Sequence, residues 1–302
     1  MVQDRKSKVF KIKTKKKQSK DFTVKEENEL LKFLYQTLGK NNKIKTLLKN
    51  KFIKVNDVAI TQYNHPLKEG DKVVVNYEKE SQEKRFRDIS IVYEDNDIIV
   101  IDKHAGLLSI STAKENKRTA FRILSTHVKL KDDKNLIFIV HRLDRDTSGL
   151  MMFAKSEKIK KILQENWNEI VKERTYLALI EGKPEPWSDS ITSYLHESKA
   201  LIVYSSNNPE SGQKATTHYK TFKSRKGFSL LKVWLETGRK NQIRVHLRDI
   251  GFPIVGDSKY GSEIDPIGRL GLHAWVLNFN HPTTGELMEF KTQIPRKFTR
   301  LV

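Results

Sequence analysis

Residues 137–156, IFIVHRLDRDTSGLMMFAKS, constrain the fold of this chain more than any other stretch. An apolar run from Ile137 to Val140 stops abruptly, and a second apolar run covers Leu150 to Phe153. The segment between them is charged and ends in small turn residues. This pattern predicts two buried strands joined by a loop. Loops held by a rigid sheet often carry catalytic groups, although a charged surface turn with internal Arg–Asp pairs would show the same pattern.

Residues 141–150, HRLDRDTSGL, resemble the signature of the RluA family of RNA pseudouridine synthases. Two further stretches that are similar to the family follow in the expected order, KERTYLALI at 172–180 and TGRKNQIRVHL at 237–247. The resemblance extends from Asp88 to the C-terminus and implies an α+β fold built on a large, mostly antiparallel sheet. The residues agree, because many short apolar runs alternate with turn residues and few helical patterns lie between them.

The resemblance implies catalytic roles for three residues. Asp144 matches the family's catalytic Asp, which would act as a nucleophile or as a base, and the sequence leaves this choice open. Arg244 matches the basic residue that pairs with this Asp. An Arg suits that role because it is always charged and can bind a carboxylate with two parallel hydrogen bonds. Tyr176 matches an aromatic residue whose ring could stack on the uracil and whose hydroxyl could assist proton removal from carbon 5.

Other residues are expected to bind the RNA or to support the site. A uridine that is pulled out of a folded RNA leaves a gap in the base stack. We expect Arg142 to fill this gap, and Arg145 to contact a phosphate or form a salt bridge. Leu272 is expected to be an apolar wall of the uridine pocket. Arg239 and His246 are expected to support the catalytic residues from behind.

The expected reaction needs no cofactor. Isomerisation of uridine breaks the bond between the ribose and base nitrogen 1, rotates the base and rejoins it through carbon 5. The chain has no Cys, which excludes disulfides, thiolate metal sites and Cys nucleophiles. It also contains no P-loop or other recognisable cofactor motif. We therefore expect no bound cofactor and no metal.

The charge of the chain predicts a polyanionic partner. Its net charge is +20, with 57 Lys and Arg against 37 Asp and Glu. Residues 1–20 hold nine Lys or Arg and one Asp, so +8 lies in a basic N-terminal tail. This favours RNA over a membrane surface, because the tail lacks a long amphipathic pattern. No apolar run approaches the 18 or so residues of a membrane span. We expect a cytoplasmic monomer.

The chain is expected to contain two folded domains. Residues 21–78 would form a small α+β RNA-binding domain, 79–87 a charged linker, and 88–302 the catalytic domain. Within the last of these, helical periodicity predicts helices at 118–128 and 158–171. Enzymes with this pairing of domains act on large-subunit ribosomal RNA, so the resemblance makes ribosomal RNA the first expected substrate and transfer RNA the second.

The small domain is expected to begin with a helix. Thr23 and Glu26 fit a capping box, and Gly39 fits the C-terminus of that helix. A short lysine-rich helix and a hairpin about Asn56–Asp57 follow. This arrangement resembles the S-four-type RNA-binding domain. A helix face rich in lysine can follow phosphates without reading sequence, although a solvated lysine face without any ligand would look alike.

Three other functions fit parts of the sequence. The HRLD stretch resembles the HRD loop of protein kinases, but the Gly-rich loop, DFG and the spaced Asn are missing. A metal-dependent nuclease could use Asp144 and Asp146, but no further carboxylate cluster is obvious. A non-catalytic RNA-binding or ribosome-assembly protein would keep the tail and the small domain and use the large domain as a scaffold. Convergence of Asp144, Tyr176 and Arg244 on one pocket would favour the enzyme.

Overall fold

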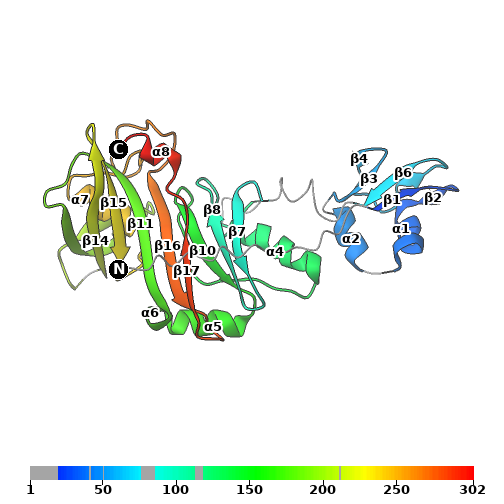
Figure 1. Ribbon diagram of the computed structural model, residues 1–302, viewed down its shortest axis with the longest axis horizontal. Coiled ribbons are helices and arrows are strands. Elements are labelled where there is room, and N and C mark those ends of the chain that lie inside the picture. The colour runs from blue at the N-terminus through cyan, green and yellow to red at the C-terminus, as the bar shows by residue number, and fades with distance from the viewer. Residues whose placement is uncertain (1–19, 41, 50, 76–85, 113–117, 211) are drawn as a thin grey trace, which may run out of the picture. The chain divides into compact units, whose positions relative to one another are not determined.

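The computed structural model describes residues 20–302 apart from 41, 50, 76–85, 113–117 and 211. The chain divides into two compact units, Met1–Arg85 and Phe86–Val302 (Figure 1). The basic tail, apart from Lys20, and most of the expected linker at 79–87 lie outside the described residues. Phe86 belongs to the second unit, where its ring packs against His127 with 5.4 Å between the ring centroids.

The first unit is a small α+β domain. Its elements in chain order are β1 Lys20–Thr23, β2 Asn28–Glu29, α1 Leu30–Leu38, α2 Asn42–Lys49, β3 Ile53–Val55, β4 Val58–Ala59, β5 Pro66–Leu67 and β6 Lys72–Val75. Four strands form an antiparallel sheet in the order β1-β6-β3-β4, and β2 pairs with β5. Both helices bury their apolar side chains, Leu30 and Leu34 from α1 and Ile44 and Leu48 from α2.

The first helix starts later than predicted. Residues 20–23 pair with β6 as strand β1, and α1 begins at Leu30 without a side-chain cap. The Thr23–Glu26 capping box is therefore wrong, because the first residues gain more from pairing at a sheet edge than from a helical turn. Gly39 ends α1 with a φ of 80°, as predicted. The hairpin is also confirmed, since Asn56 and Asp57 have φ values of 47° and 66° between β3 and β4.

The second unit contains an 11-stranded sheet. Its strands are β7 Ile89–Glu94, β8 Ile98–Lys103, β9 Phe138–Ile139, β10 Ser148–Ala154, β11 Val171–Glu181, β12 Ser188–Glu197, β13 Val203–Ser206, β14 Gln213–Arg225, β15 Phe228–Leu235, β16 Leu272–Asn280 and β17 Leu287–Lys291. The order is β13-β12-β14-β15-β11-β16-β10-β8-β7, with β17 beside β16 and β9 beside β10. Among these described pairs only β10–β16 is parallel. The expected α+β fold is confirmed.

Helices cover both faces of this sheet. They are α4 Ala120–Lys131, α5 Glu157–Glu165, α6 Trp167–Ile170, α7 Gln242–Asp249 and α8 Arg296–Thr299. Side chains of α4 and α7 join the core on one face, whereas those of α5 and α8 belong to cores that include the other face. The helix predicted at 158–171 is interrupted at Asn166, which ends α5 and precedes α6.

The parallel contact between β10 and β16 requires a glycine. Gly149 has a φ of 114°, and a Cβ atom placed there would lie 2.1 Å from the carbonyl oxygen of Ala274. Only a residue without a side chain permits both this backbone conformation and this close approach. The pairing fixes the start of β10 beside β16, and with it the end of the charged loop at 141–147.

Candidate active site

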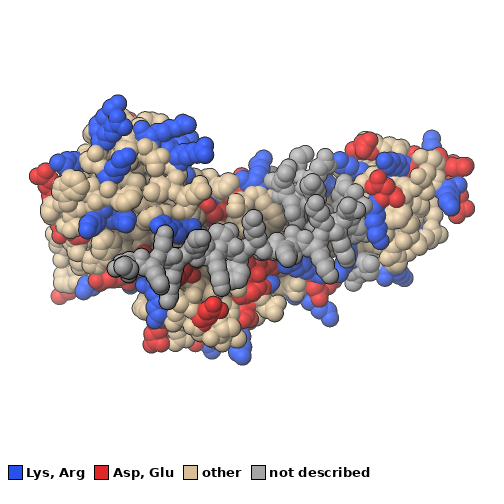
Figure 2. All heavy atoms as spheres, viewed as in Figure 1, with Lys and Arg blue, Asp and Glu red and all other residues tan. Residues whose placement is uncertain are grey.

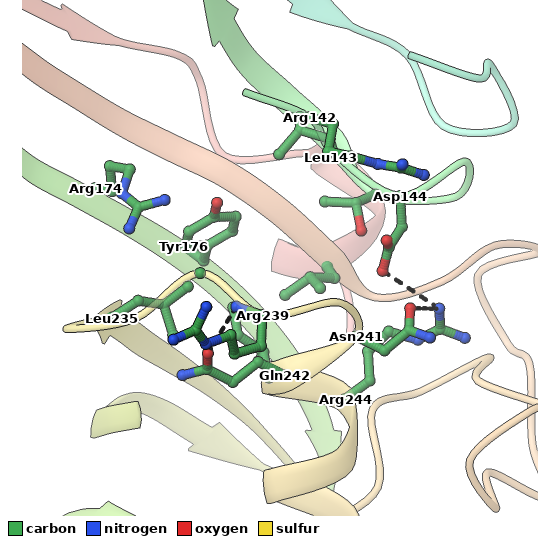
Figure 3. Close-up of a pocket in the computed structure, with 14 residues that line it drawn as sticks. Arg142, Leu143, Asp144, Arg174, Tyr176, Leu235, Arg239, Asn241, Gln242 and Arg244 are labelled. Atoms are coloured by element: carbon green, nitrogen blue, oxygen red, sulfur yellow. Dashed lines mark hydrogen bonds and ion pairs between the residues drawn. The ribbon is translucent and has the colours of Figure 1, made fainter. Parts of the chain in front are cut away.

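Fourteen residues from separate parts of the second unit line one pocket (Figure 3). They come from the loop before β10, from β11, β15 and β16, and from α7 with the loop that precedes it. Five of the six residues expected to catalyse the reaction or to bind the RNA are among them, namely Arg142, Asp144, Tyr176, Arg244 and Leu272. Segments up to 130 residues apart in the chain therefore meet at one site.

The loop that carries Asp144 is fixed on both sides of this residue. The Ser109 hydroxyl donates to the carbonyl oxygen of Leu143 at 2.7 Å and accepts from the Leu143 amide at 3.2 Å. On the other side, the Lys103 ammonium and the Gly106 amide both donate to the carbonyl of Arg145, at 2.9 and 3.0 Å. These bonds hold the backbone, so the Asp144 side chain points into the pocket from a rigid support.

Lys103 is a fully buried cation under this loop. Its ammonium also donates to the carbonyls of Leu107 at 2.8 Å and His104 at 3.1 Å, so three carbonyl oxygens surround it. Burial lowers the pKa of Lys103 to about 7, and the negative charges of Asp146 and Asp144 oppose this decrease. Near neutral pH the Lys103 amine is thus only partly protonated, and the two loop carboxylates favour its charged form.

Arg244 connects Asp144 to a buried carboxylate. Its Nη1 atom lies 3.5 Å from an oxygen of Asp144, the long end of the hydrogen-bond range. Its other nitrogens bind Asp257 in a bidentate pair, Nε at 2.8 Å and Nη2 at 2.7 Å. The Asn241 side-chain oxygen accepts from Nη1 at 2.9 Å, and the Tyr260 ring lies 4.8 Å beneath the guanidinium carbon. The guanidinium is held in one orientation before any substrate is present.

The electrostatic balance at Arg244 favours the charged form. Burial alone would lower the pKa of Arg244, but the hydrogen bonds and negative charge of Asp257 outweigh it, and the pKa is raised. The Asp257 side chain is only 1% exposed and that of Arg244 is 11% exposed, whereas Asp144 keeps 25% exposure. The permanent pair is therefore Arg244–Asp257, and the weaker contact leaves Asp144 available to a ligand in the pocket.

Tyr176 forms the opposite wall of the pocket from Asp144 (Figure 3). It lies on β11 between Val233 of β15 and Ala274 of β16. Burial raises the pKa of Tyr176, the positive charge of Arg174 opposes this, and the negative charge of Asp144 adds to it. The phenol is therefore protonated near neutral pH. Its ring offers an apolar surface, and no residue in the described part of the chain forms a hydrogen bond with its hydroxyl.

Known proteins match this arrangement of motifs and fold. A family model described as RNA pseudouridylate synthase matches residues 97–249. This chain belongs to the RNA pseudouridylate synthase family. An uncharacterized RNA pseudouridine synthase of Bacillus subtilis is 32% identical over 254 residues, 82% of this chain and 83% of that protein. The ribosomal large subunit pseudouridine synthase D of Haemophilus influenzae is 30% identical over 86% of this chain and 85% of its own.

A solved structure shares the fold of this RNA pseudouridine synthase. Human RNA Pseudouridylate Synthase Domain Containing 4 superposes with a TM-score of 0.58 at 23% identity, and the match covers 70% of this chain and 90% of that one. The protein is thus an isomerase that converts uridine in RNA into pseudouridine. Among the described residues, no helix is both long and apolar enough to cross a membrane.

Of the other three predicted residues, one lines the synthase pocket and two do not. Arg145 is exposed and does not line the pocket, although its carbonyl anchors the loop. Arg239 does line it. His246 is a fully buried residue of α7, where Ser193 and Thr217 bind its two ring nitrogens at 2.9 and 2.8 Å. Burial lowers the pKa of His246 to about 4, so the ring is neutral and supports the helix.

The sequence interpretation missed several residues of the synthase site. Asp257 and Asn241 hold Arg244, and Ser109 and Lys103 hold the loop. The Asn241 side chain contacts both Arg244 and Tyr260, which fits a supporting role. Arg174 also lines the pocket, with its guanidinium carbon 5.2 Å from the centre of the Trp167 ring. The described residues contain no cluster of His, Asp or Glu that could hold a metal.

Proposed function

We propose that this synthase modifies ribosomal RNA and that Asp144 performs the reaction on a uridine flipped out of the RNA. The observation that carries the proposal is the convergence of Asp144, Tyr176 and Arg244 on one pocket, with 3.5 Å between Asp144 and Arg244. Relatives from Haemophilus influenzae and Nitrosomonas europaea are named ribosomal large subunit pseudouridine synthase D, which supports ribosomal RNA as the first substrate. Transfer RNA is the second candidate.

The residues of the pocket suit the steps of the isomerisation. Asp144 attacks the ribose or the base, or removes a sugar proton, while the bond to base nitrogen 1 breaks. The detached uracil rotates against the Tyr176 ring and the Leu272 side chain, and then bonds to the ribose through carbon 5. When the new bond forms, the bond to Asp144 breaks or the removed proton returns to the sugar. The proton on carbon 5 then leaves to the Asp144 carboxylate or to water, and base nitrogen 1 takes up a proton. Arg244 places a positive charge beside the Asp144 carboxylate throughout.

The rim of the pocket suits an RNA strand. Arg142 is exposed beside Asp144 and can occupy the place of the flipped base, at a site where unstacking costs a few kcal/mol. Arg174 and Arg239 add positive charge to the lining and can hold the flanking phosphates. Arg145, outside the pocket, is placed to contact a phosphate further along the strand.

The remaining sequence-based assignments belong to the same proposal. We assign residues 21–78 to an S-four-type RNA-binding domain, 79–87 to a linker and 88–302 to the catalytic domain. The lysine-rich α2 helix supports RNA binding by the small domain, since Lys43, Lys45 and Lys49 are exposed on it. The basic tail at 1–20 would add sequence-independent attraction to phosphates. We propose a monomer as the active form.

The test compares Asp144→Asn with a matched variant two residues away. Asp146→Asn makes the same chemical change at an exposed carboxylate that does not line the pocket. RNA from cells that lack the synthase would be mapped for pseudouridine, with the wild type or either variant restored. We expect one or a few sites to disappear, and the wild type and Asp146→Asn to restore them. Asp144→Asn should restore none, while its affinity for RNA changes little.

Purified protein separates the enzyme from the non-catalytic alternative. Unmodified ribosomal and transfer RNA would be incubated with each variant, and pseudouridine counted. Formation of pseudouridine in transfer RNA alone would replace the proposed substrate. If Asp144→Asn were as active as the wild type, the assigned catalytic residue would be wrong. If the wild type bound RNA tightly but modified neither substrate, the RNA-binding or ribosome-assembly role would gain support.

A further inference from the structure

A strip of lysines and aromatic rings lies on the face of the sheet that points away from Tyr176. Tyr176 is in register with Val233 of β15, and successive residues of a strand point to opposite faces. Lys232 and Trp234, on either side of Val233, therefore face away from the pocket. The cross-strand partners of these two residues on β14 are Lys220 and His218. In the view of Figure 2, Lys and Arg side chains gather on the end of the second unit that contains β14, β15 and α8.

Lys220 and Lys232 are directly opposite each other in the antiparallel ladder of β14 and β15. Residues in such positions have Cβ atoms about 5 Å apart, and like charges there destabilise the sheet. Lys220 is exposed and Lys232 is half-buried. Among the described residues, no carboxylate forms an ion pair with either. The two lysines thus share one face of the sheet without a carboxylate partner, which suits a bound phosphate.

Exposed aromatic rings border this lysine pair. Phe222 is 46% exposed and Trp234 is 41% exposed, which is unusual for large apolar side chains on a sheet. The Lys232 ammonium lies 4.9 Å from the centre of the Phe222 ring and 5.4 Å from that of Trp275. Lys291 on β17 lies 4.4 Å from the centre of the Trp275 ring. The strip therefore continues across the sheet as alternating rings and cations.

Glu289 shares the face of Lys291 on β17, whereas two other acidic side chains, at the Trp234 end of the strip, already have hydrogen-bond partners. Glu236 binds the His218 ring at 2.9 Å, and that ring stacks on Trp234 with 5.6 Å between centroids. Glu173 accepts hydrogen bonds from Thr175 and Asn278. Both carboxylates lie toward the Trp234 end, so the end that contains Lys220 and Lys232 stays positive.

We infer that this strip, Lys220, Phe222, Lys232, Trp234 and Lys291, binds an unpaired segment of RNA. Lysines that bridge phosphates and rings that stack on bases are the two components of sequence-tolerant single-strand binding. An acidic peptide would use the lysines but would gain little from the rings, and a duplex would hide its bases from them. This surface is separate from the pocket and would bind RNA whether or not Asp144 is catalytic.

The sharpest test is Lys220→Glu in the full-length protein. This change removes the like-charge pair and creates a Glu–Lys pair across the strands, so the protein should be as stable as the wild type or more so. Binding of a fluorescein-labelled 12-nucleotide oligouridine, measured by fluorescence anisotropy, should weaken. The slope of log affinity against log salt should fall by about 0.7 for the lost phosphate contact. If Lys220 had only a structural role, a substitution that raised stability would not weaken binding of the oligouridine.

Two further variants complete the test. Lys134→Glu, in an exposed loop, makes the same charge change and should retain nearly all affinity. Trp234→Ala should weaken oligouridine binding about tenfold, by loss of one stacked base, with an unchanged salt slope. Equal affinities for Lys220→Glu and Lys134→Glu would overturn the inference. So would a Trp234→Ala variant with wild-type affinity, or polyglutamate that competes as well as oligouridine, which would indicate an acidic protein partner.

Discussion

Arg244 shows how one buried side chain can serve two carboxylates. Its bidentate pair with Asp257 satisfies two nitrogens at 2.7 and 2.8 Å, and the third nitrogen is left between Asn241 and Asp144. A buried ion pair contributes little net stability, because both groups lose water. We infer that the pair serves to orient the Arg244 guanidinium, which it holds beside the Asp144 carboxylate.

The Arg244–Asp257 pair can be tested with a double-mutant cycle. Asp257→Leu alone leaves a buried, uncompensated guanidinium, and we expect it to lower the free energy of unfolding by about 3–5 kcal/mol. Arg244→Met alone leaves the buried Asp257 carboxylate without its counter-charge and should lower the free energy of unfolding by a similar amount. The double variant removes both charges, so it should recover most of this stability while it stays inactive. Urea unfolding gives the stabilities and pseudouridine formation gives the activity.

The outcome separates structural from catalytic effects of the pair. If the two single changes added up in the double variant, the side chains would not be coupled and the assigned pairing would be incorrect. Recovery of stability together with recovery of activity would show that Asp144 does not need the positive charge of Arg244.

The sequence located the residues that we propose to be catalytic more readily than the residues that support them. Asp144, Tyr176 and Arg244 each lie in a run of residues that resembles the family, so the motif alone assigned them. Asp257 and Ser109 were missed because their roles depend on contacts across the fold. Nothing in the residues around Ser109 indicates that its hydroxyl would hold the backbone of Leu143, 34 positions later.

At the scale of elements, α7 is the part of the fold that the sequence left undefined. Six of its eight residues, Gln242–Leu247, are buried, so it shows no solvent-facing side that would mark an amphipathic helix. Its polar residues are satisfied by neighbouring strands: Gln242 donates to Thr216 and Thr217, and His246 binds Ser193 and Thr217. The strands were easier to predict, because apolar runs bounded by turn residues are local signals.

The burial of His246 predicts that acid loosens α7. Its pKa is about 4 in the folded protein, below the ordinary value of 6.5, so the folded state favours the neutral ring. The stability from this group is fully present above pH 6.5 and is lost as the pH falls toward 4, by roughly 3 kcal/mol in all. Urea unfolding of the wild type at pH 7 and pH 4.5 should therefore show a marked loss.

His246→Gln should reduce this dependence on pH. The variant is expected to be less stable at pH 7, since it disturbs the bonds to Ser193 and Thr217, but to lose less stability than the wild type between pH 7 and 4.5. His104→Gln, at an exposed ring, is the control and should behave as the wild type. If all three proteins lost the same amount of stability in acid, the loss would come from groups other than His246. His141 and His273 are such groups, because both have pKa values lowered to about 3.

Over the whole molecule, positive charge is divided between the N-terminal part and the catalytic unit. Nine Lys or Arg against one Asp give the first twenty residues a charge of +8, and the other +12 of the total of +20 lies on the rest. The catalytic unit has its own hydrophobic cores and is a compact unit in itself. We therefore expect truncation to separate the proposed contribution of the N-terminal part to RNA binding from catalysis.

Deletion of residues 1–80 should weaken RNA binding and flatten its dependence on salt. Each lost contact between a lysine and a phosphate of single-stranded RNA lowers the slope of log affinity against log salt by about 0.7. The loss of several contacts would therefore be evident in a titration from roughly 50 to 300 mM salt, where counterion release dominates. Thermal unfolding of the truncated protein provides the control, since a cooperative transition would show that the catalytic unit remains folded. An equal affinity with an unchanged slope would mean that the tail and the small domain do not contact RNA. The pocket and the strip on β14 and β15 would then account for the whole attraction.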